Sequence, residues 1–248
     1  MGDYGKHENR ILGIIPARGG SQGVSGKNIK ELCGLPLIGH IFKSACESKM
    51  LTDIILSTND KRIADVGRSL GMNVPFLRPE EYATSTAKSI DVVKHAIGEM
   101  ERQNGCVYDF GVLLQPTCPL TQTHHIDESV RLLRYDGYNS VVSLTRVDHY
   151  HPYFMMRKQG DSYERLLQNT EEYTNRQHLP EVYVRCGNVY SFERNLVMEH
   201  DKLFDYKSGH IIIEKRFNIN IDDQIDWLIA EALVSHYGKQ KIKECSSP

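Results

Sequence analysis

The chain has 248 residues, a length typical of one large domain or of one domain with an inserted segment. Its 30 lysines and arginines nearly balance 32 aspartates and glutamates, so the net charge of -2 argues against nucleic-acid binding and requires any anion site to be a local patch. No apolar run reaches membrane-spanning length, the polar start MGDYGKHENR lacks a signal-peptide core, and six scattered cysteines without a CxxC pair predict reduced thiols in the cytoplasm.

Short apolar runs alternate with helical patterns along the first part of the chain. The runs predict buried strands, and apolar residues at helical spacing predict helices between them. Asp60 is suited to cap one of these helices and Gly71 to end it. Such alternation predicts an α/β fold, with a mostly parallel, doubly wound sheet covered on both faces. The strands are expected at 11–15, 53–58, 111–115 and 140–147, and the helices at 36–48, 61–70, 89–100 and 125–135.

The alternation stops between residues 149 and 190, in a segment rich in Tyr, Arg, Gln and Asn. This segment could be a small sub-domain, a lid, or an arm that contacts another subunit or the acceptor. Strands are predicted again at 188–192 and 211–213, and a closing helix at 223–237. We therefore expect a polar N-terminal extension at 1–10 and a single domain at 11–248 with one excursion.

The stretch IIPARGGSQGVSGKN, residues 14–28, joins the first predicted strand to a flexible, cationic loop. In open α/β sheets ligands bind at the carboxyl ends of strands, and glycines let backbone N–H groups approach an anion. Arg18 and Lys27 add charges suited to phosphate oxygens. The loop therefore predicts a polyphosphate site, the alternative being a basic surface turn. It matches neither GxxxxGK[ST] nor GxGxxG, which favours a nucleotidyltransferase over a P-loop protein or a nicotinamide-dependent Rossmann oxidoreductase.

Several motifs carry a resemblance to a known family: IIPARGGSQGVSGKN, GLPLI, STND, PFLRPEEYATSTAKSID, LLQPTCPL and INIDDQID. Together they resemble the acylneuraminate cytidylyltransferases over nearly the whole chain. The resemblance implies a Rossmann-like nucleotidyltransferase fold, a dimer and a Mg²⁺ cofactor. It also implies transfer of CMP from CTP to a nine-carbon, sialic-acid-like ulosonic acid.

The resemblance also implies roles for particular residues. Arg18, Lys27 and Asp222 match catalytic positions, and Asp222 with Asn220 matches the metal site. Gln115, Arg176 and Tyr190 match positions on the sugar side. The CTP-binding positions correspond to Ala17, Arg18, Gly19, Gly20, Ser21, Lys27, Asn28, Arg78 and Ser89.

Taken without the resemblance, most of these residues have structural interpretations. Arg78 could form a surface ion pair, Ser89 could cap the helix that follows it, Asp222 could be a helix N-cap, and Tyr190 could be ordinary strand packing. A strand-end amide such as that of Gln115 favours ligand contact. The adjacent His124 and His125 begin a predicted helix and are expected to be exposed, with no role.

The chain departs from the family pattern at four places. Gln22 replaces a lysine, Lys88 a small polar residue, and Asn220 the first aspartate of the metal motif. In VRCGNVY, residues 184–190, Cys186 stands before the glycine where the family has asparagine, and an asparagine follows it instead. These departures leave open a different acidic sugar as acceptor, such as a legionaminic- or pseudaminic-type acid, and a catalytically weak nucleotide-binding partner protein.

Overall fold

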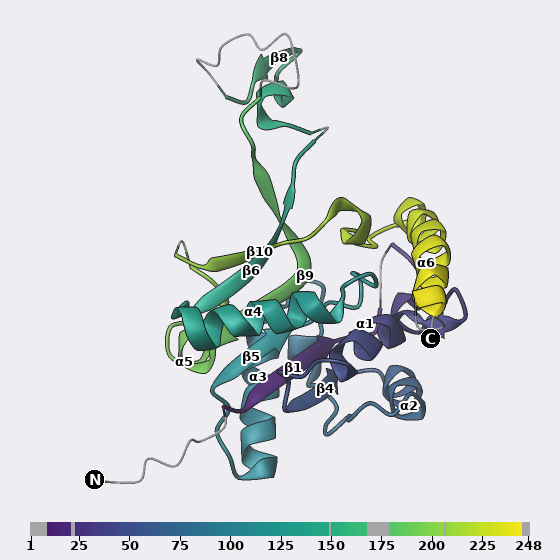
Figure 1. The fold of residues 1–248 in the computed structure, drawn as a ribbon, viewed down its shortest axis with the longest axis vertical. Helices are drawn as coiled ribbons and strands as arrows, with labels where there is room; N and C mark the ends of the chain where they lie inside the picture. The colour runs from purple at the N-terminus through teal and green to yellow at the C-terminus, as the bar shows by residue number, and fades with distance from the viewer. Residues whose placement is uncertain (1–8, 21–22, 149, 168–178, 206, 245–248) are drawn as a thin grey trace.

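A computed structural model describes residues 9–20, 23–148, 150–167, 179–205 and 207–244, with 238–244 described for the backbone alone. Its body is a sheet layered between helices, and a narrow arm projects from one end (Figure 1). Most of the predicted N-terminal extension lies outside the described residues. Among the described helices, none has the length and apolar character needed to cross a bilayer.

The body is built on a six-stranded sheet with the order β10-β6-β9-β5-β1-β4. Pairings of β1 with β4, β1 with β5 and β10 with β6 are parallel, while β9 runs antiparallel to both of its neighbours. This arrangement confirms the predicted mostly parallel sheet. The strands are β1 (Ile11–Pro16), β4 (Asp53–Ser57), β5 (Phe110–Leu113), β6 (Ser140–Arg146), β9 (Tyr183–Glu193) and β10 (Gly209–Ile212).

Helices cover both faces of this sheet, as expected of a doubly wound fold. The apolar side chains of α1 (Leu37–Cys46), α2 (Lys61–Ser69) and α4 (Thr123–Asp136) belong to one buried cluster. Those of α3 (Ser89–Asn104) and α5 (Arg194–Met198) belong to a second cluster, which lies on the opposite face. The two clusters explain why the strands are nearly continuous apolar runs, because their residues are buried on both sides.

Local signals at helix ends agree with the sequence at two places and differ at two. The Asp60 carboxylate accepts a hydrogen bond from Arg62 N at 2.8 Å, and Gly71 adopts φ 84 where α2 ends. Lys88, with no side-chain cap, occupies the N-cap of α3, so Ser89 is not the capping residue. The prediction that His125 is exposed is wrong: it is 3% exposed, and its Nδ1 accepts a hydrogen bond from Gln122 N.

The segment predicted as an excursion is a projecting arm. A hairpin of β7 (Met156–Gln159) and β8 (Ser162–Arg165) stands at its end, beyond a stalk formed by β6 and the start of β9 (Figure 1). The predicted return of the sheet at residue 188 is wrong, because β9 already pairs with β6 from Tyr183. Residues 183–185 are exposed, so they show no apolar alternation that would predict a strand.

The C-terminal helix α6 (Gln224–Glu244) closes the body over a third buried cluster, with Trp227 at its centre. The cluster includes Leu32 from the two-residue strands β2 (Glu31–Leu32) and β3 (Leu35–Pro36). This packing brings the segment before α6 against the loop after β1. Short 3-10 turns complete the chain at η1 (Lys27–Ile29), η2 (Glu80–Tyr82), η3 (Pro152–Phe154) and η5 (Lys215–Phe217).

Candidate active site

A cavity of about 280 Å³ opens at the carboxyl ends of β1 and β5. Such an edge is where ligands bind in open α/β sheets. Six of the predicted site residues line it: Arg18, Lys27, Asn28, Arg78, Ser89 and Gln115. The structure therefore brings together residues from four separate segments of the chain. The other lining residues are Pro16, Tyr82, Thr84, Ser85, Ala87, Val92, Leu113, Pro116 and Thr117.

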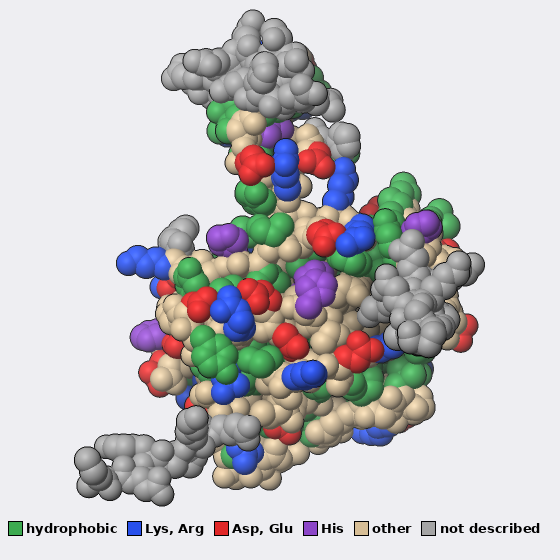
Figure 2. Space-filling model, in the orientation of Figure 1, with side chains coloured by type: hydrophobic (Ala, Val, Ile, Leu, Met, Phe, Trp, Pro, Cys, Tyr) green, Lys and Arg blue, Asp and Glu red, His purple; other side chains and the backbone are tan. Residues whose placement is uncertain are grey.

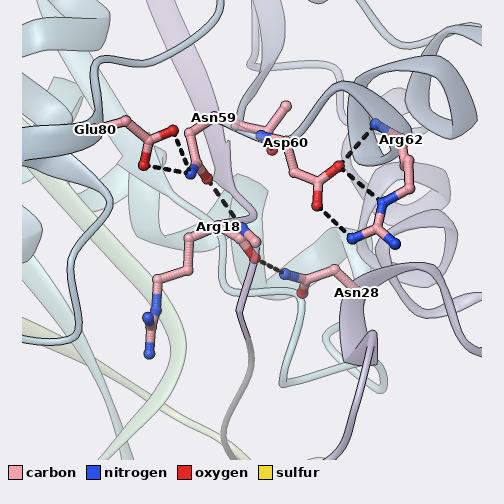
Figure 3. A network of polar contacts seen from close by, with 8 residues as sticks. Arg18, Asn28, Asn59, Asp60, Arg62 and Glu80 are labelled. Atoms are coloured by element: carbon pink, nitrogen blue, oxygen red, sulfur yellow. Dashed lines mark hydrogen bonds and ion pairs between the residues drawn. The ribbon is translucent and has the colours of Figure 1, made fainter.

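The backbone of the cationic loop is fixed by side-chain amides. Gly19 N donates to Asn59 Oδ1 at 2.9 Å, and Asn59 Nδ2 donates in turn to both carboxylate oxygens of Glu80 at 3.1 Å (Figure 3). On the other side, Asn28 Nδ2 donates to Arg18 O at 3.0 Å. The Arg18 side chain points away from this network, without a dashed contact in Figure 3. The loop is therefore held in place by its backbone while its guanidinium stays available.

Arg78 is a cation buried in the wall of the cavity. Its side chain lines the cavity, the residue is 4% exposed, and neither Nε nor Nη2 has a hydrogen-bond partner among the described residues. Burial, and next the nearby charge of Arg18, lower the pKa of Arg78 to about 10, against a smaller opposite effect of Glu80. A buried, unsatisfied charge is destabilising, and a bound anion would remove that penalty. With the carboxylates of the described residues, Arg78 does not form the ion pair considered from the sequence.

Lys27 joins the cationic loop to the segment before α6. Its Nζ donates to Ile221 O at 2.6 Å and lies 4.0 Å from Asp222 Oδ1. Burial lowers the pKa of Lys27, Asp222 opposes that effect, and Arg18 adds to it. Only 12% of the Lys27 side chain is exposed. Lys27 therefore supports the fold as well as lining the cavity.

The carboxylates in the segment from Asn220 to Asp226 have different roles. Asp223 Oδ1 accepts from Ile225 N and Asp226 N, and Asp226 Oδ2 accepts from the backbone N–H groups of Asp222 and Asp223. These two residues cap α6, so the Asp222 carboxylate is not the cap. The Asp222 side chain is 73% exposed, next to Lys27.

Close packing holds this segment against the cationic loop. A Cβ atom on Gly23 would overlap the backbone carbonyl oxygen of Asp222, so the two backbones can touch only because residue 23 is glycine. Asn220 Nδ2 donates to Asp222 Oδ2 at 2.6 Å, and Asn220 Oδ1 faces the Cys118 thiol at 3.9 Å. The amide of Asn220 thus orients the carboxylate of Asp222, the residue that the resemblance assigned to the metal site. Within the described ranges there is no group of three or more His, Cys, Asp or Glu residues able to hold a metal ion.

Two of the residues predicted for the sugar side, Gln115 and Tyr190, lie near the pairing of β5 with β9. Strand β5 stops at Leu113, so Gln115 follows the strand instead of ending it. A Cβ atom on Gly187 would lie 3.0 Å from Oε1 of Gln115. Tyr190 pairs with Leu113 in the sheet, but unlike Leu113 it does not line the cavity. Asn188 does not reach the cavity: it is fully buried, and its Nδ2 donates to Thr121 Oγ1 at 3.0 Å and Phe217 O at 3.2 Å.

The remaining predicted residues have simpler placements. Ala17 is buried, and its N–H donates to Ser57 O at 2.9 Å, so this amide is already used in the fold. Gly20 has φ 71, a conformation that favours glycine. Ser21 and Arg176 lie outside the described residues, as does Gln22. The wall formed by Tyr82, Thr84, Ser85 and Thr117 was missed, although the run ATST before α3 is the kind of hydroxyl-rich loop that indicates such a surface.

A family model described as cytidylyltransferase matches residues 12–232. Among curated relatives, the CMP-N,N'-diacetyllegionaminic acid synthase of Legionella pneumophila is 32% identical over 228 residues, covering 91% of this chain and 96% of that protein. The N-acylneuraminate cytidylyltransferase of Escherichia coli is 31% identical over 236 residues, which cover 94% of this chain and 54% of the longer relative.

Solved structures agree on the fold. The structure of CMP:2-keto-3-deoxy-manno-octonic acid synthetase complexed with CTP superposes with a TM-score of 0.69 at 12% identity, covering 92% of this chain and 100% of that one. A 4-diphosphocytidyl-2C-methyl-D-erythritol synthase from Anaerococcus prevotii gives a TM-score of 0.62 at 14% identity, covering 92% and 99%. At such low identity these similarities support the shared α/β architecture.

Proposed function

We propose a function from the premise that this chain belongs to the cytidylyltransferase family, which the match over residues 12–232 establishes. The protein transfers CMP from CTP to the anomeric hydroxyl of a nonulosonic acid and releases pyrophosphate. The observation that carries this proposal is the group of three cations at one cavity. Arg18, Lys27 and the buried Arg78 all line it, and Arg18 disfavours the charged form of both others. Nε and Nη2 of Arg78 have no hydrogen-bond partner among the described residues.

Such a cavity is suited to a polyanion with a neutral ring attached. A triphosphate would relieve the mutual repulsion of the three cations and provide Arg78 with hydrogen-bond acceptors. Tyr82, Ser89 and Val92 offer an aromatic ring, a hydroxyl and an apolar surface near Arg78, where a base and ribose could bind. We therefore assign the Arg78 side to the nucleoside and the Lys27 side to the phosphates.

The reaction needs positioning and charge stabilisation more than covalent chemistry by the protein. The acceptor hydroxyl forms a bond to the α-phosphorus, the bond from that phosphorus to pyrophosphate breaks, and the hydroxyl proton passes to solvent. Lys27 and Arg18 stabilise the charge that develops on the phosphoryl and leaving-group oxygens. Asn28 helps to fix the position of Arg18 by donating a hydrogen bond to the Arg18 carbonyl oxygen.

The residues present also fit a Mg²⁺ cofactor. This ion commonly takes one or two protein carboxylates and fills its other positions with water and substrate phosphates. Asp222 provides one exposed carboxylate beside Lys27, and Asn220 donates a hydrogen bond to it. Asp222 would thus hold the ion, which when bound neutralises phosphate charge, whereas Asn220 acts on Asp222 instead of serving as a second strong ligand.

For the acceptor we propose a nonulosonic acid of the legionaminic type. The Legionella relative carries such a sugar in its name, and the acceptor-side departure at residues 186–188 supports a pocket unlike that for N-acetylneuraminate. Cys186 is a buried thiol where the family pattern has an amide, and the amide of Asn188 is used inside the protein. The cavity therefore lacks a side-chain amide at this position.

We further propose that the protein is a homodimer that works in the cytoplasm, with the arm contacting the second copy. Figure 2 shows hydrophobic side chains on the arm and its stalk. Exposed apolar residues on a thin projection favour association. They include Tyr150 (82% exposed), Phe154, Met156, Tyr163 (64% exposed) and Leu167. Sedimentation equilibrium of the full chain tests this, and a monomer at micromolar concentration would contradict it.

Pyrophosphate release in the presence of Mg²⁺ tests the reaction itself. CTP, ATP, GTP and UTP are each combined with N-acetylneuraminate, with a di-N-acetylated legionaminic acid and with a pseudaminic-type acid. We expect release with CTP and the legionaminic acid and little with the other nucleotides, and mass spectrometry should identify the CMP-sugar. A higher kcat/KM for N-acetylneuraminate would overturn the acceptor assignment, and CTP binding without turnover on any sugar would favour the non-catalytic partner protein.

A further inference from the structure

Arg185 is a cation on the sugar side that the motifs did not single out. It belongs to the first half of β9, is exposed, and its guanidinium carbon lies 4.1 Å from the centre of the Phe204 ring. Among the residues that the structure describes, no carboxylate pairs with it. A guanidinium stacked on an aromatic ring is held in one plane while its edge remains free to donate.

Tyr190 connects this cation to the cavity. Both side chains lie against the Phe204 ring, the Arg185 guanidinium at 4.1 Å from its centre and the Tyr190 ring at 6.2 Å. Burial raises the pKa of Tyr190, and the charge of Arg185 opposes that effect. The rings of Tyr190 and Phe204 are tilted by 30° to each other. Arg185, Tyr190 and Phe204 thus form one cluster, which we call the β9 aromatic cluster.

The β9 aromatic cluster lies on the face of the sheet that carries the cavity. Tyr190 packs against the same buried cluster as Leu113, and these two residues are partners in the β5–β9 ladder. Leu113 lines the cavity, as do Ser89 and Val92 at the start of α3 on that face. Gly187, between Arg185 and Tyr190, leaves open space beside Gln115, since any side chain there would approach the Gln115 amide.

We propose that Arg185 binds the carboxylate of the acceptor sugar and so helps to set which sugars react. This inference rests on the proposed function and extends it to one residue. Arg18, Lys27 and Arg78 line the cavity, whereas Arg185 is a separate cation held over the Phe204 ring in the β9 aromatic cluster. A guanidinium matches a carboxylate with two parallel hydrogen bonds, and stacking on Phe204 limits the rotamer entropy lost on binding.

The experiment compares Arg185→Gln with Arg134→Gln, using two acceptors with saturating CTP. Arg134 is a matched control because its guanidinium also lies over a ring, that of Tyr135 at 5.3 Å, on helix α4. The acceptors are the best nonulosonic acid of the panel and its methyl ester. We expect Arg185→Gln to raise KM for the acid about 10- to 100-fold with an unchanged KM for CTP, as for one lost charge-assisted interaction. Arg134→Gln should have the same KM for the acid and for CTP as the wild type.

The methyl ester distinguishes a direct contact from a structural role. The wild-type enzyme should prefer the acid strongly, and Arg185→Gln should lose most of that preference, whereas damage to the fold would weaken both acceptors equally. Isothermal titration of the acceptor into protein with an unreactive α,β-methylene CTP gives the same comparison without turnover. If Arg185→Gln binds CTP poorly, Arg185→Lys replaces it, with an expected intermediate loss of preference.

An unchanged acid-over-ester preference in the Arg185 variant overturns the inference and would leave the carboxylate to another group, for which Arg176→Gln is the next variant. That outcome differs from failure of the proposed function, in which the wild-type protein itself would release no pyrophosphate with any acceptor.

Discussion

The cavity, proposed as the nucleotide end of the site, and the β9 aromatic cluster, proposed as its acceptor end, differ in how firmly the fold fixes their cations. At the nucleotide end, Arg78 is 4% exposed, and the backbone of Arg18 is fixed between Asn59 and Asn28 through neighbouring amides. At the proposed acceptor end, Arg185 is exposed on a strand that continues into the stalk and lies over the Phe204 ring. Buried, unpaired charge at the first end costs stability until a ligand arrives, whereas an exposed charge at the second costs little.

This difference indicates how the two specificities can vary. The nucleotide end is tied to buried networks, so most substitutions there should alter folding and binding together. The acceptor end depends on a few side chains over an exposed strand, so its preference can change without loss of the fold. The following predictions test that contrast, from the largest expected effect to the smallest.

Lys27→Ala should have the largest effect on turnover. Loss of a cation that stabilises the transition state costs about 2–4 kcal/mol in kcat/KM. The variant should also lose about 1–2 kcal/mol of unfolding free energy, because Nζ no longer donates to Ile221 O. Pyrophosphate release and urea denaturation measure the two effects, with the exposed Lys61→Ala as the control. Wild-type turnover in a folded Lys27→Ala protein would remove Lys27 from the mechanism.

Arg78→Met should weaken CTP binding and stabilise the free protein. We expect Kd for CTP to rise about 10- to 100-fold from the lost charge-assisted contact. The melting temperature without nucleotide should rise, because the substitution removes a buried cation whose Nε and Nη2 have no partner in the described structure. Calorimetric titration and thermal melts give both quantities. A lower melting temperature without CTP would show that Arg78 is satisfied in the free protein and would contradict the contrast drawn above.

The sequence predicted the nucleotide end better than the acceptor end, for a physical reason. Backbone N–H groups, glycines and strand ends act locally, so the stretch at 14–28 and the apolar strands indicated the loop, the sheet and the cavity edge. Arg185 acts through Phe204, which is distant in sequence and meets it only after β9 pairs with β5 and β6. The exposed start of β9 carries no apolar periodicity, so its strand and its cation could not be read from the pattern.

Burial of side chains that depend on long-range packing was also not predictable. His125 starts a helix, which favoured exposure, yet Phe217 from the far end of the chain lies 5.7 Å from its ring. The role of Asp222 was ambiguous for a similar reason, since a run of Asp222, Asp223 and Asp226 cannot show which carboxylate caps the helix. The hydrogen bonds of the folded protein show that Asp223 and Asp226 cap α6.

The protonation of His125 should make the stability of the folded protein pH-dependent. Burial lowers the pKa of His125 from 6.5 to about 3, so the folded protein holds it neutral while the unfolded chain takes up a proton. The contribution of neutral His125 to the free energy of unfolding is therefore complete above pH 6.5. It is lost as the pH falls below 6.5, by about 1.4 kcal/mol per pH unit. Urea denaturation between pH 7 and 5 should show this slope reduced in His125→Gln, with the exposed His124→Gln as the control. Equal slopes in all three proteins would show that another group controls acid stability.

Asn220→Asp should give the smallest effect and addresses the metal. In the wild-type protein Asn220 donates to Asp222 at 2.6 Å, so an aspartate would replace an attraction by repulsion between two carboxylates, which a divalent cation would relieve. Half-maximal activity should therefore need less Mg²⁺, by up to about tenfold, because a carboxylate is the better ligand for a hard cation. Binding of Mn²⁺ followed by electron paramagnetic resonance gives a readout independent of turnover, and Asn220→Ala separates loss of the hydrogen bond from gain of a charge. An unchanged or raised Mg²⁺ requirement in Asn220→Asp would mean that residue 220 does not face the metal and acts through the orientation of Asp222.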